Sequence, residues 1–393
     1  MKLDVLLTDG NYQNTYAILR ALKEKNLTVG IIFNYKPSVC FFSRYVDKRF
    51  FIKSDIVKNP DESNLKAYLA EIIKILHEYE TDVLLPVGNV SYRFASLFKK
   101  ELERFCRIPV VNYDLMEIAQ DKSKTFEYAE KNNIPIPFTL RLSVNDDIDD
   151  VIGKVKFPCV IKKTNYDEAG VIYCNTKEEL KINLLSLTTK RKNHQSMPII
   201  QEYVKGEGTG YYGIYNNGKR IGYFMHERIH EFPITGGAST LAKSIYNADL
   251  EETGNQVLEG LKWHGVAMVE FKRDSKAGSL KLMEINPKFW GSLELSYKAG
   301  INFPYLAYLL AMNKPIPESS YQTEVYFRWT LPYDLLWYRF ASRENRKQFK
   351  ALKEKVTINS NIHWDDPATI FFNVVFTILK LFKAKKYPHG HIK

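Results

Sequence analysis

The sequence predicts a mixed α/β fold: a doubly wound N-terminal α/β domain, a two-lobed α+β region and a mostly helical C-terminal extension. Apolar runs and helical stretches alternate over the first 112 residues, which is typical of a parallel sheet covered by helices. From residue 121 onward, short apolar strands are separated by hairpin signals, which favours antiparallel sheets. The 393 residues are 45% hydrophobic and 26% charged, a composition that excludes disordered, collagen-like and disulfide-scaffold chains.

The first domain is expected over residues 1–112. An apolar run, a turn near Asp9, a helix and a second apolar run follow one another in its first 33 residues. This order makes a βαβ unit, whose strands must run parallel. The expected strands are 3–7, 28–33, 82–88 and 108–111, and the expected helices are 15–26, 65–79 and 92–105.

The two lobes are expected over residues 113–195 and 196–310. Two prolines in the segment 134–137 hold the chain extended after a helix at 121–133. The dipeptide Asn217–Gly218 is the commonest two-residue hairpin signal. The other expected strands are 157–164, 171–174, 197–204, 266–274 and 279–287, with helices at 177–187 and from residue 293.

Two familiar motifs occur in contexts that argue against their usual functions. The segment 226–230 matches HExxH, but a zinc protease needs this motif on a helix, and here it falls on the second arm of the hairpin. On a strand the two imidazoles would be roughly 13 Å apart, too far for one Zn²⁺. The segment 208–213 matches GxGxxG, but a strand follows it instead of a helix, so a dinucleotide-binding turn is not expected.

Cysteine usage indicates a reducing compartment. Cys40, Cys106, Cys159 and Cys174 are far apart and form no CxxC pair, which favours buried thiols over a disulfide framework or a zinc site. The first residues place an acid within the apolar run and contain no long apolar segment, which argues against a signal peptide. We therefore expect a cytoplasmic protein.

The strongest chemical signal is the strand pair predicted over residues 266–292. If its loop centres near residues 276 and 277, position 270 pairs with position 283, give or take one, so Glu270 can lie directly opposite Glu284. Asn286 shares the face of Glu284, because the two are two residues apart. The neighbouring residues are mostly apolar, and two carboxylates about 4 Å apart repel by about 4 kcal/mol at an effective dielectric of 20. A hard dication with oxygen ligands, Mg²⁺ or Mn²⁺, fits this set. A hairpin neutralised by a shared proton or by a lysine is the alternative.

Cations are expected near the same place, because Mg²⁺ held by few carboxylates usually completes its shell with phosphates. Lys162 lies on a strand with apolar neighbours, and Lys122 begins a helix where its charge opposes the helix dipole. Both positions make sense if an external phosphate meets the ammonium groups. Arg228 on the hairpin and Lys288 just after the strand pair add further positive charge.

The ordered set Asp121–Lys122, FPCVIKK, IIQEYVKGE, VEF and LMEINPKFWGS resembles the ATP-grasp superfamily of ATP-dependent carboxylate–amine ligases, and within it the carbamoyl-phosphate-synthase-like ligases. The resemblance covers residues 1–310. It implies a pre-ATP-grasp domain followed by a small lobe and a large lobe that clasp ATP. It also implies the reaction: a substrate carboxylate attacks the γ-phosphate to give an acyl phosphate and ADP, and an amine then displaces phosphate. The implied substrates are a small carboxylate and a small amine, and the family often forms homodimers.

The resemblance implies a nucleotide site. Lys122 and Lys162 would contact the ATP phosphates, and the segment from Gln201 through Glu202 to Val204 would hold adenine through its backbone.

The resemblance also implies a metal and transfer site. Glu270, Glu284 and Asn286 would hold two Mg²⁺ ions, with Glu284 bridging them. Lys288 and Arg228 would stabilise the transferred phosphoryl group and the acyl phosphate.

Three positions depart from the family pattern. The loop 164–170 contains only Gly170, where the family often has a glycine-rich phosphate lid, and this leaves open a nucleotide-binding module without catalysis. Gly208 stands where many members have the glutamate that binds ribose, so Glu207 is the expected substitute. Lys288 replaces the usual arginine, which loses a bidentate fork but keeps the charge.

The extension, residues 311–393, contains an apolar helix expected over 368–382. Its polar residues Thr369, Asn373, Thr377 and Lys380 form one narrow stripe. Fifteen residues span about 22 Å, short of the ~30 Å hydrocarbon core, so the helix is not expected to cross a membrane. Two interpretations stay open: docking against the protein's own body or a second subunit, or an interfacial helix whose segment 368–386 meets anionic lipid. The second would place the protein peripherally on the inner membrane face, as a ligase or as a structural protein.

The formal net charge of +11 has two expected sources. One is the group of phosphate-facing cations, and the other is the set of five lysines that follows Pro367 without any acidic residue. Because these two sources account for the surplus, nucleic acid is not expected as a partner.

Overall fold

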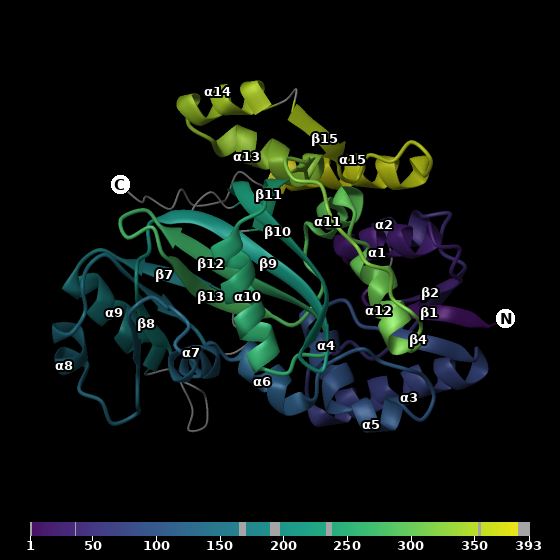
Figure 1. The fold of residues 1–393 in the computed structure, drawn as a ribbon, viewed down its shortest axis with the longest axis horizontal. Coiled ribbons are helices and arrows are strands. Elements are labelled where there is room, and N and C mark those ends of the chain that lie inside the picture. Colours follow the sequence, from purple (N-terminus) through teal and green to yellow (C-terminus); the bar gives the residue numbers. More distant parts are fainter. Residues whose placement is uncertain are drawn as a thin grey trace.

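The computed structural model describes residues 2–35, 37–164, 170–188, 197–232, 238–352 and 355–383. Within these residues the chain forms three sheets, and both the predicted parallel sheet and the predicted antiparallel sheets are confirmed. The small antiparallel sheet lies at one end of the molecule and the N-terminal domain at the other, with the large sheet between them (Figure 1).

The N-terminal sheet is parallel in the order β3-β2-β1-β4, because helices join its strands. Strands β1 (Leu3–Leu7) and β2 (Val29–Phe33) are almost entirely buried, as expected for apolar strands covered on both faces. The other elements are β3 (Lys48–Phe51), β4 (Thr81–Leu85), α1 (Gln13–Lys23), α2 (Val39–Phe42), α3 (Glu62–Glu78), α4 (Asn89–Leu97), α5 (Lys99–Leu102) and α6 (Tyr113–Gln120).

One strand of this domain was wrongly predicted, and β3 was missed. The segment 108–111 lies within the described range 37–164 but forms no strand there. Ile108 and Val110 are buried in the core, yet the Val110 amide donates to the Ile108 carbonyl at 2.9 Å, which turns the chain instead of extending it. The apolar run at 108–111 therefore predicted burial in the core correctly, but it did not predict the backbone conformation.

The small sheet is antiparallel in the order β5-β8-β6-β7. Its elements are β5 (Thr139–Arg141), α8 (Ile148–Gly153), β6 (Cys159–Lys162), β7 (Val171–Cys174), α9 (Lys177–Thr188) and β8 (Ile199–Glu202), preceded by α7 (Lys122–Lys131). The predicted lobe boundary after residue 195 falls inside this sheet, because β8 pairs with both β5 and β6. Cys159 and Cys174, distant in sequence, lie opposite each other on β6 and β7 as buried free thiols.

The large sheet has the order β13-β12-β9-β10-β11-β14-β15. Asn217 and Gly218 have positive φ values of 49° and 89°, as a type I′ hairpin turn requires, so the predicted hairpin is confirmed. The elements up to residue 311 are β9 (Gly206–Asn216), β10 (Lys219–Phe232), β11 (Ala238–Ser244), α10 (Ala248–Gly260), β12 (Gly265–Asp274), β13 (Leu280–Asn286), α11 (Leu293–Ala299) and α12 (Phe303–Ala311).

Both motifs that the sequence context argued against lie on the β9–β10 hairpin. The GxGxxG segment is within β9, and His226 and His230 are within β10, so neither motif stands at the start of a helix or on one. The two histidines have separate partners: His226 Nε2 bonds to the Tyr212 hydroxyl, and His230 Nδ1 lies 3.1 Å from Asp334 Oδ1. The geometry that a zinc protease needs is therefore missing from this segment.

The C-terminal extension adds strands to the large sheet as well as helices. Strand β14 (Tyr326–Arg328) pairs with β11, and β15 (Val356–Asn359) pairs with β14. In Figure 1 the extension lies above the large sheet and reaches the N-terminal domain near α2. Its helices are η1 (Thr330–Asp334), α13 (Leu335–Phe340), α14 (Arg343–Leu352) and α15 (Pro367–Lys383). Across the described part of the chain, no helix combines the length and apolarity needed to span a bilayer.

Candidate active site

A cavity of about 570 Å³ lies where the small sheet meets the large sheet. Its volume is within the range of about 300–1,000 Å³ that is usual for ligand sites. Of the eleven residues predicted from the sequence, all but Glu207 line this cavity: Lys122, Lys162, Gln201, Glu202, Val204, Arg228, Glu270, Glu284, Asn286 and Lys288.

The two predicted carboxylates face each other on neighbouring strands. Strands β12 and β13 pair in the register Glu270↔Glu284, which confirms the predicted pairing. Asn286 Nδ2 donates to Glu284 Oε1 at 2.8 Å and to Glu270 Oε1 at 3.3 Å, so the carboxamide bridges the pair. Burial raises the pKa of Glu270, and the nearby Glu284 charge adds to this effect. The side chains of Glu270 and Glu284 remain 17% and 30% exposed, which leaves their oxygens open to the cavity.

Lys122 neutralises Glu284. Its Nζ lies 2.8 Å from Glu284 Oε2, and its charge holds the pKa of Glu284 well below the ordinary value. The position of Lys122 is fixed by the helix start, because the Asp121 side chain caps α7 by accepting from the amides of Ser123 and Lys124. A lysine at the first helical residue therefore points at a carboxylate of the large sheet.

Arg228 and Glu231 bring a second group of charges into the cavity from β10. Arg228 forms an ion pair with Glu270 and lies 3.5 Å from Glu231 Oε1. A Cβ added at Gly208 would lie 3.1 Å from Glu231 Oε1, so Glu231 lies beside the position where the sequence pattern lacks a carboxylate. The predicted substitute, Glu207, is exposed and does not line the cavity, because adjacent residues of a strand face opposite sides.

Lys162 and Lys288 bring two more positive groups to the cavity. Lys162 ends β6 and is 8% exposed; burial, with a contribution from Lys122, lowers the pKa of Lys162 to about 8. Its ammonium lies 5.8 Å from the centre of the Phe126 ring. Burial also lowers the pKa of Lys288. Buried ammonium groups favour an anionic ligand, since such a ligand restores the solvation that they lose.

The end of β8 and the residues after it form one wall of the cavity. The buried Gln201 amide donates to Thr139 Oγ1 at 2.9 Å, and Glu202 Oε1 lies 3.6 Å from Lys281 Nζ. The Val204 carbonyl accepts from Lys272 Nζ at 3.3 Å. Because the side chains of Gln201 and Glu202 have protein partners, recognition of a flat ring at this wall would depend on backbone groups.

Aromatic residues also line the cavity and were not predicted. The Tyr212 ring lies 4.4 Å from that of Trp290, and its hydroxyl bonds to His226 Nε2. Burial lowers the pKa of His226, so this imidazole is neutral near pH 7. Trp329 comes from the C-terminal extension and lies against Gly291, where an added Cβ would be 2.8 Å from its ring. The sequence contains no pattern that predicts this group, because its members come from distant segments that only tertiary packing brings together.

The donor set fits a hard dication. Glu270 and Glu284 supply carboxylate oxygens that are partly open to the cavity, which Asn286 also lines, and such oxygens are the ligands that Mg²⁺ prefers. In the part of the chain that the structure describes, no group of three or more His, Cys, Asp or Glu residues suited to a metal occurs, so the carboxylate pair would need the Asn286 carboxamide and external oxygens to complete a metal's shell.

Two family models match the chain over the two lobes. Residues 119–211 match a RimK-like ATP-grasp domain, and residues 233–330 match the family described as ATP-grasp in the biosynthetic pathway with Ter operon.

Among curated proteins, the chain is 23% identical over 263 residues to a D-aspartate ligase of Enterococcus faecium. The match covers 61% of this chain and 61% of the relative's length.

Solved structures share the fold at low sequence identity. An N5-carboxyaminoimidazole synthetase of Staphylococcus aureus has a TM-score of 0.62 at 17% identity, covering 82% of this chain and 81% of its own. An L-amino acid ligase of Bacillus licheniformis has a TM-score of 0.61 at 15% identity, covering 79% and 75%. The biotin carboxylase domain of a Hydrogenobacter thermophilus 2-oxoglutarate carboxylase, solved with MgADP, has a TM-score of 0.65 at 14% identity, covering 83% and 74%. The two lobes, the cavity between them and both domain matches agree: residues 119–211 and 233–330 of this chain are similar to ATP-grasp domains.

Proposed function

We propose that the protein is an ATP-dependent ligase that joins a small carboxylate to a small amine and releases ADP and phosphate. One observation carries the proposal: Glu270 and Glu284 face each other in a cavity that also contains Lys122, Lys162 and Arg228. Paired oxygen ligands surrounded by cations suit a nucleotide triphosphate with its metal, since phosphoryl transfer depends on positioning and charge neutralisation.

The comparisons support the same proposal. The curated relative is named a D-aspartate ligase and one structural neighbour an L-amino acid ligase, and another neighbour was solved with MgADP. Amino acids are therefore the first substrates to test, as carboxylate, as amine or as both.

Within this proposal ATP occupies the cavity with its phosphates toward Lys122 and Lys162 and its adenine against the wall from Gln201 to Val204. Glu270, Glu284 and Asn286 would hold Mg²⁺, or Mn²⁺ in its place. The bound metal neutralises phosphate charge and orients the γ-phosphate for in-line attack.

The chain's own residues then serve two displacements. In the first, an oxygen of the substrate carboxylate attacks the γ-phosphorus and ADP leaves with the bonding electrons. In the second, the amine nitrogen attacks the acyl carbon, phosphate leaves, and the nitrogen loses a proton. We infer that Arg228 and Lys288 stabilise the negative charge of the transferred group in both steps.

We also propose the setting in which this reaction occurs. The substrates are small molecules, nucleic acid is not a partner, the location is cytoplasmic, and the assembly is either a monomer or a homodimer.

The most informative test offers pooled D- and L-amino acids and small carboxylates to the protein with Mg-ATP and follows the nucleotide product. Release of ADP and phosphate that requires both an added carboxylate and an added amine supports the proposal. AMP and pyrophosphate would contradict the acyl-phosphate route. Nucleotide binding without turnover would instead indicate a binding module that has no catalytic activity.

A pH dependence follows from Lys162. Because burial lowers its pKa to about 8, the ammonium is charged below that pH and loses its charge above it, so kcat/KM for ATP should fall as the pH rises through about 8. The measurement is kcat/KM for ATP between pH 6.5 and 9.5. In Lys162→Arg the decline should move to higher pH, since arginine stays charged. A decline that is unchanged in Lys162→Arg would assign it to another group.

We infer that Glu231, in place of the exposed Glu207, receives the ribose hydroxyls of the nucleotide. Glu231→Gln should therefore raise the KM for ATP by about tenfold with little change in kcat, because a charged acceptor is replaced by a neutral one. Glu207→Gln serves as the matched control and should leave KM unchanged. Equal effects of the two substitutions would refute the assignment.

A further inference from the structure

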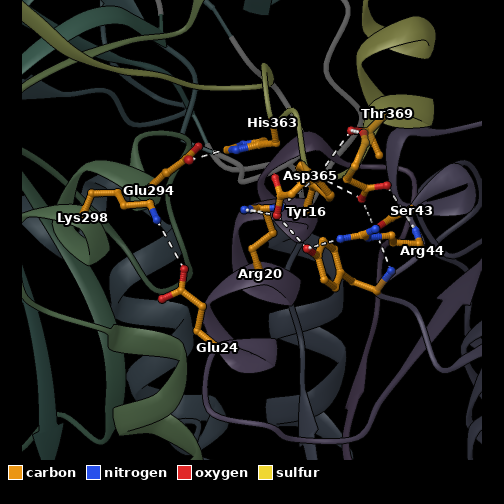
Figure 2. A network of polar contacts seen from close by, with 12 residues as sticks. Tyr16, Arg20, Glu24, Ser43, Arg44, Glu294, Lys298, His363, Asp365 and Thr369 are labelled. Atoms are coloured by element: carbon orange, nitrogen blue, oxygen red, sulfur yellow. Dashed lines mark hydrogen bonds and ion pairs between the residues drawn. The ribbon is translucent and has the colours of Figure 1, made fainter.

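The C-terminal helix α15 is attached to the N-terminal domain through polar groups. Asp366, just before the helix, accepts from the Tyr16 hydroxyl at 3.0 Å and the Ser43 hydroxyl at 2.6 Å. The neighbouring Asp365 accepts from Arg20 at 3.0 Å and from the Tyr45 hydroxyl at 2.6 Å. Figure 2 shows this network between the start of α15 and the N-terminal domain.

The polar stripe of α15 faces the protein. Thr369, Asn373 and Thr377 are 0%, 1% and 4% exposed. Thr369 Oγ1 lies 3.3 Å from the Tyr16 hydroxyl, and Asn373 Nδ2 donates to the Asn361 carbonyl at 3.2 Å. The buried side of α15 is thus its polar side, although a surface helix normally turns its polar residues toward water.

The apolar stripe of α15 faces solvent. Phe371 and Phe382 are 74% and 73% exposed, and four apolar residues between them are also exposed: Val374, Val375, Ile378 and Leu379. Their spacing of three and four residues makes one continuous stripe along the helix. Surface helices of soluble domains turn such a stripe toward the core, so α15 has the opposite orientation to the one that stability in water favours.

The apolar surface continues beyond the helix. Trp364, two residues before Asp366, is 83% exposed. On α2 the exposed Phe42 ring lies 5.6 Å from the Phe372 ring, which joins the two elements in one patch. A contiguous exposed apolar patch of this kind marks an interaction surface more often than a chance distribution of side chains.

Charge and length decide which partner fits this surface. From Pro367 to the end the sequence has no acidic residue and has lysines at 380, 383, 385, 386 and 393. The 17 residues of α15 span about 25 Å, less than the ~30 Å of a hydrocarbon core, so the helix suits a position along a membrane surface. A second copy that packed through its own α15 would cover the apolar stripe but bring the same lysines together, because no acidic residue follows Pro367 in either copy, whereas anionic headgroups supply the counter-charge.

We propose that α15 lies in the interface of an anionic membrane. Its exposed apolar stripe, with Trp364, enters the boundary between headgroups and acyl chains, and the basic sequence from Lys380 onward supplies the charge that anionic headgroups balance. The polar network at Asp365 and Asp366 holds the helix to the N-terminal domain, so the body of the protein stays at the membrane surface. The inference is independent of the proposed reaction.

The test measures co-sedimentation of the full-length protein with vesicles of equimolar phosphatidylglycerol and phosphatidylcholine, and with phosphatidylcholine vesicles alone. The triple variant Phe371→Ser, Leu379→Ser, Phe382→Ser removes apolar side chains that are already exposed, so its fold should be retained. A matched control, Val144→Ser with Ile182→Ser, removes exposed apolar side chains elsewhere.

Wild type and control should bind the anionic vesicles, more weakly at high salt, and the triple variant should bind at least about tenfold less. Absence of wild-type binding, or equal binding by wild type and triple variant, would overturn the proposal. Equal wild-type binding to both vesicle types would overturn the role of the lysines and of anionic lipid. Self-association of the wild type that the triple variant loses, without vesicle binding, would assign the surface to a second copy instead.

Discussion

Glu284→Gln should lower kcat for ADP formation by about a hundred- to thousandfold. Glutamine keeps the size of the side chain and a hydrogen-bonding oxygen for Asn286 Nδ2, but it removes the charge that the proposed Mg²⁺ site would need. The effect should fall mainly on kcat, because positioning of the transferred phosphoryl group matters most in the transition state. The measurement is steady-state ADP release with the substrates that the pooled assay identifies.

The control for this prediction is Glu227→Gln. Glu227 is a carboxylate of strand β10 in the same sheet that does not line the cavity, so its variant should keep wild-type turnover. Far-UV circular dichroism should be close to wild type in both variants, whereas the thermal midpoint of Glu284→Gln should fall, because Lys122 loses its carboxylate partner. Retained turnover in Glu284→Gln would refute the metal assignment.

Arg228→Met should be the most destabilising of the substitutions considered, by about 3 kcal/mol in the free energy of unfolding. Arg228 pairs with Glu270, and the side chains of both are 17% exposed. Removing the cation leaves a largely buried carboxylate without a partner, which is costlier than losing the pair altogether. The same variant should lose turnover. Urea denaturation followed by tryptophan fluorescence measures the change in stability.

Two further variants test whether the loss of stability comes from the unpaired Glu270 carboxylate or from any substitution of an arginine on this strand. The double variant Arg228→Met, Glu270→Gln should recover most of the lost stability, because the carboxylate charge is gone. Arg220→Met, on the same strand, breaks a pair with Glu251 whose side chains are 34% and 19% exposed, and should cost at most about 1 kcal/mol. Equal losses in Arg228→Met and Arg220→Met, or no recovery in the double variant, would contradict the argument.

The core of the site could be predicted because it depends on local pairing. Strands β12 and β13 are joined by a short loop, so counting from the loop placed Glu270 within one residue of its partner, and a register shift between Glu270 and Phe271 sets that partner as Glu284. Lys122 was predicted from the helix start, where the Asp121 cap gives a clear boundary. In each case a few neighbouring residues determine where the side chain lies.

The rest of the site depends on contacts between distant segments. Glu231 comes beside Gly208 because β10 folds back on β9 and its register shifts between Arg228 and Glu231. Trp329 reaches the cavity directly after a strand of three residues, too short to predict. Cys159 and Cys174 likewise meet only because β6 and β7 pair. Contacts of this kind could not be predicted, because no pattern among neighbouring residues indicates which distant segment a side chain will contact.

The helix α15 illustrates a different limit. Periodicity identified its polar stripe, Thr369, Asn373 and Thr377, correctly, but not which side of the helix would face the protein. Buried polar residues need partners that lie elsewhere in the chain, here Tyr16 and the Asn361 carbonyl. Which side of an amphipathic helix is buried thus depends on the surface against which the helix packs, and not on the helix sequence alone.

The pairing of β14 and β15 with the edge of the large sheet also determines how the protein can move. The extension leaves the large sheet through these strands and returns to the N-terminal domain through α15, while Asn302 at the start of α12 donates to the Ala21 carbonyl at 2.9 Å. The N-terminal domain is therefore connected to the large sheet at several points, through α15 and through α12. The small sheet lies at the far end, away from these connections (Figure 1). We therefore expect the small sheet, which these contacts do not hold, to move more readily against the large sheet than the N-terminal domain does.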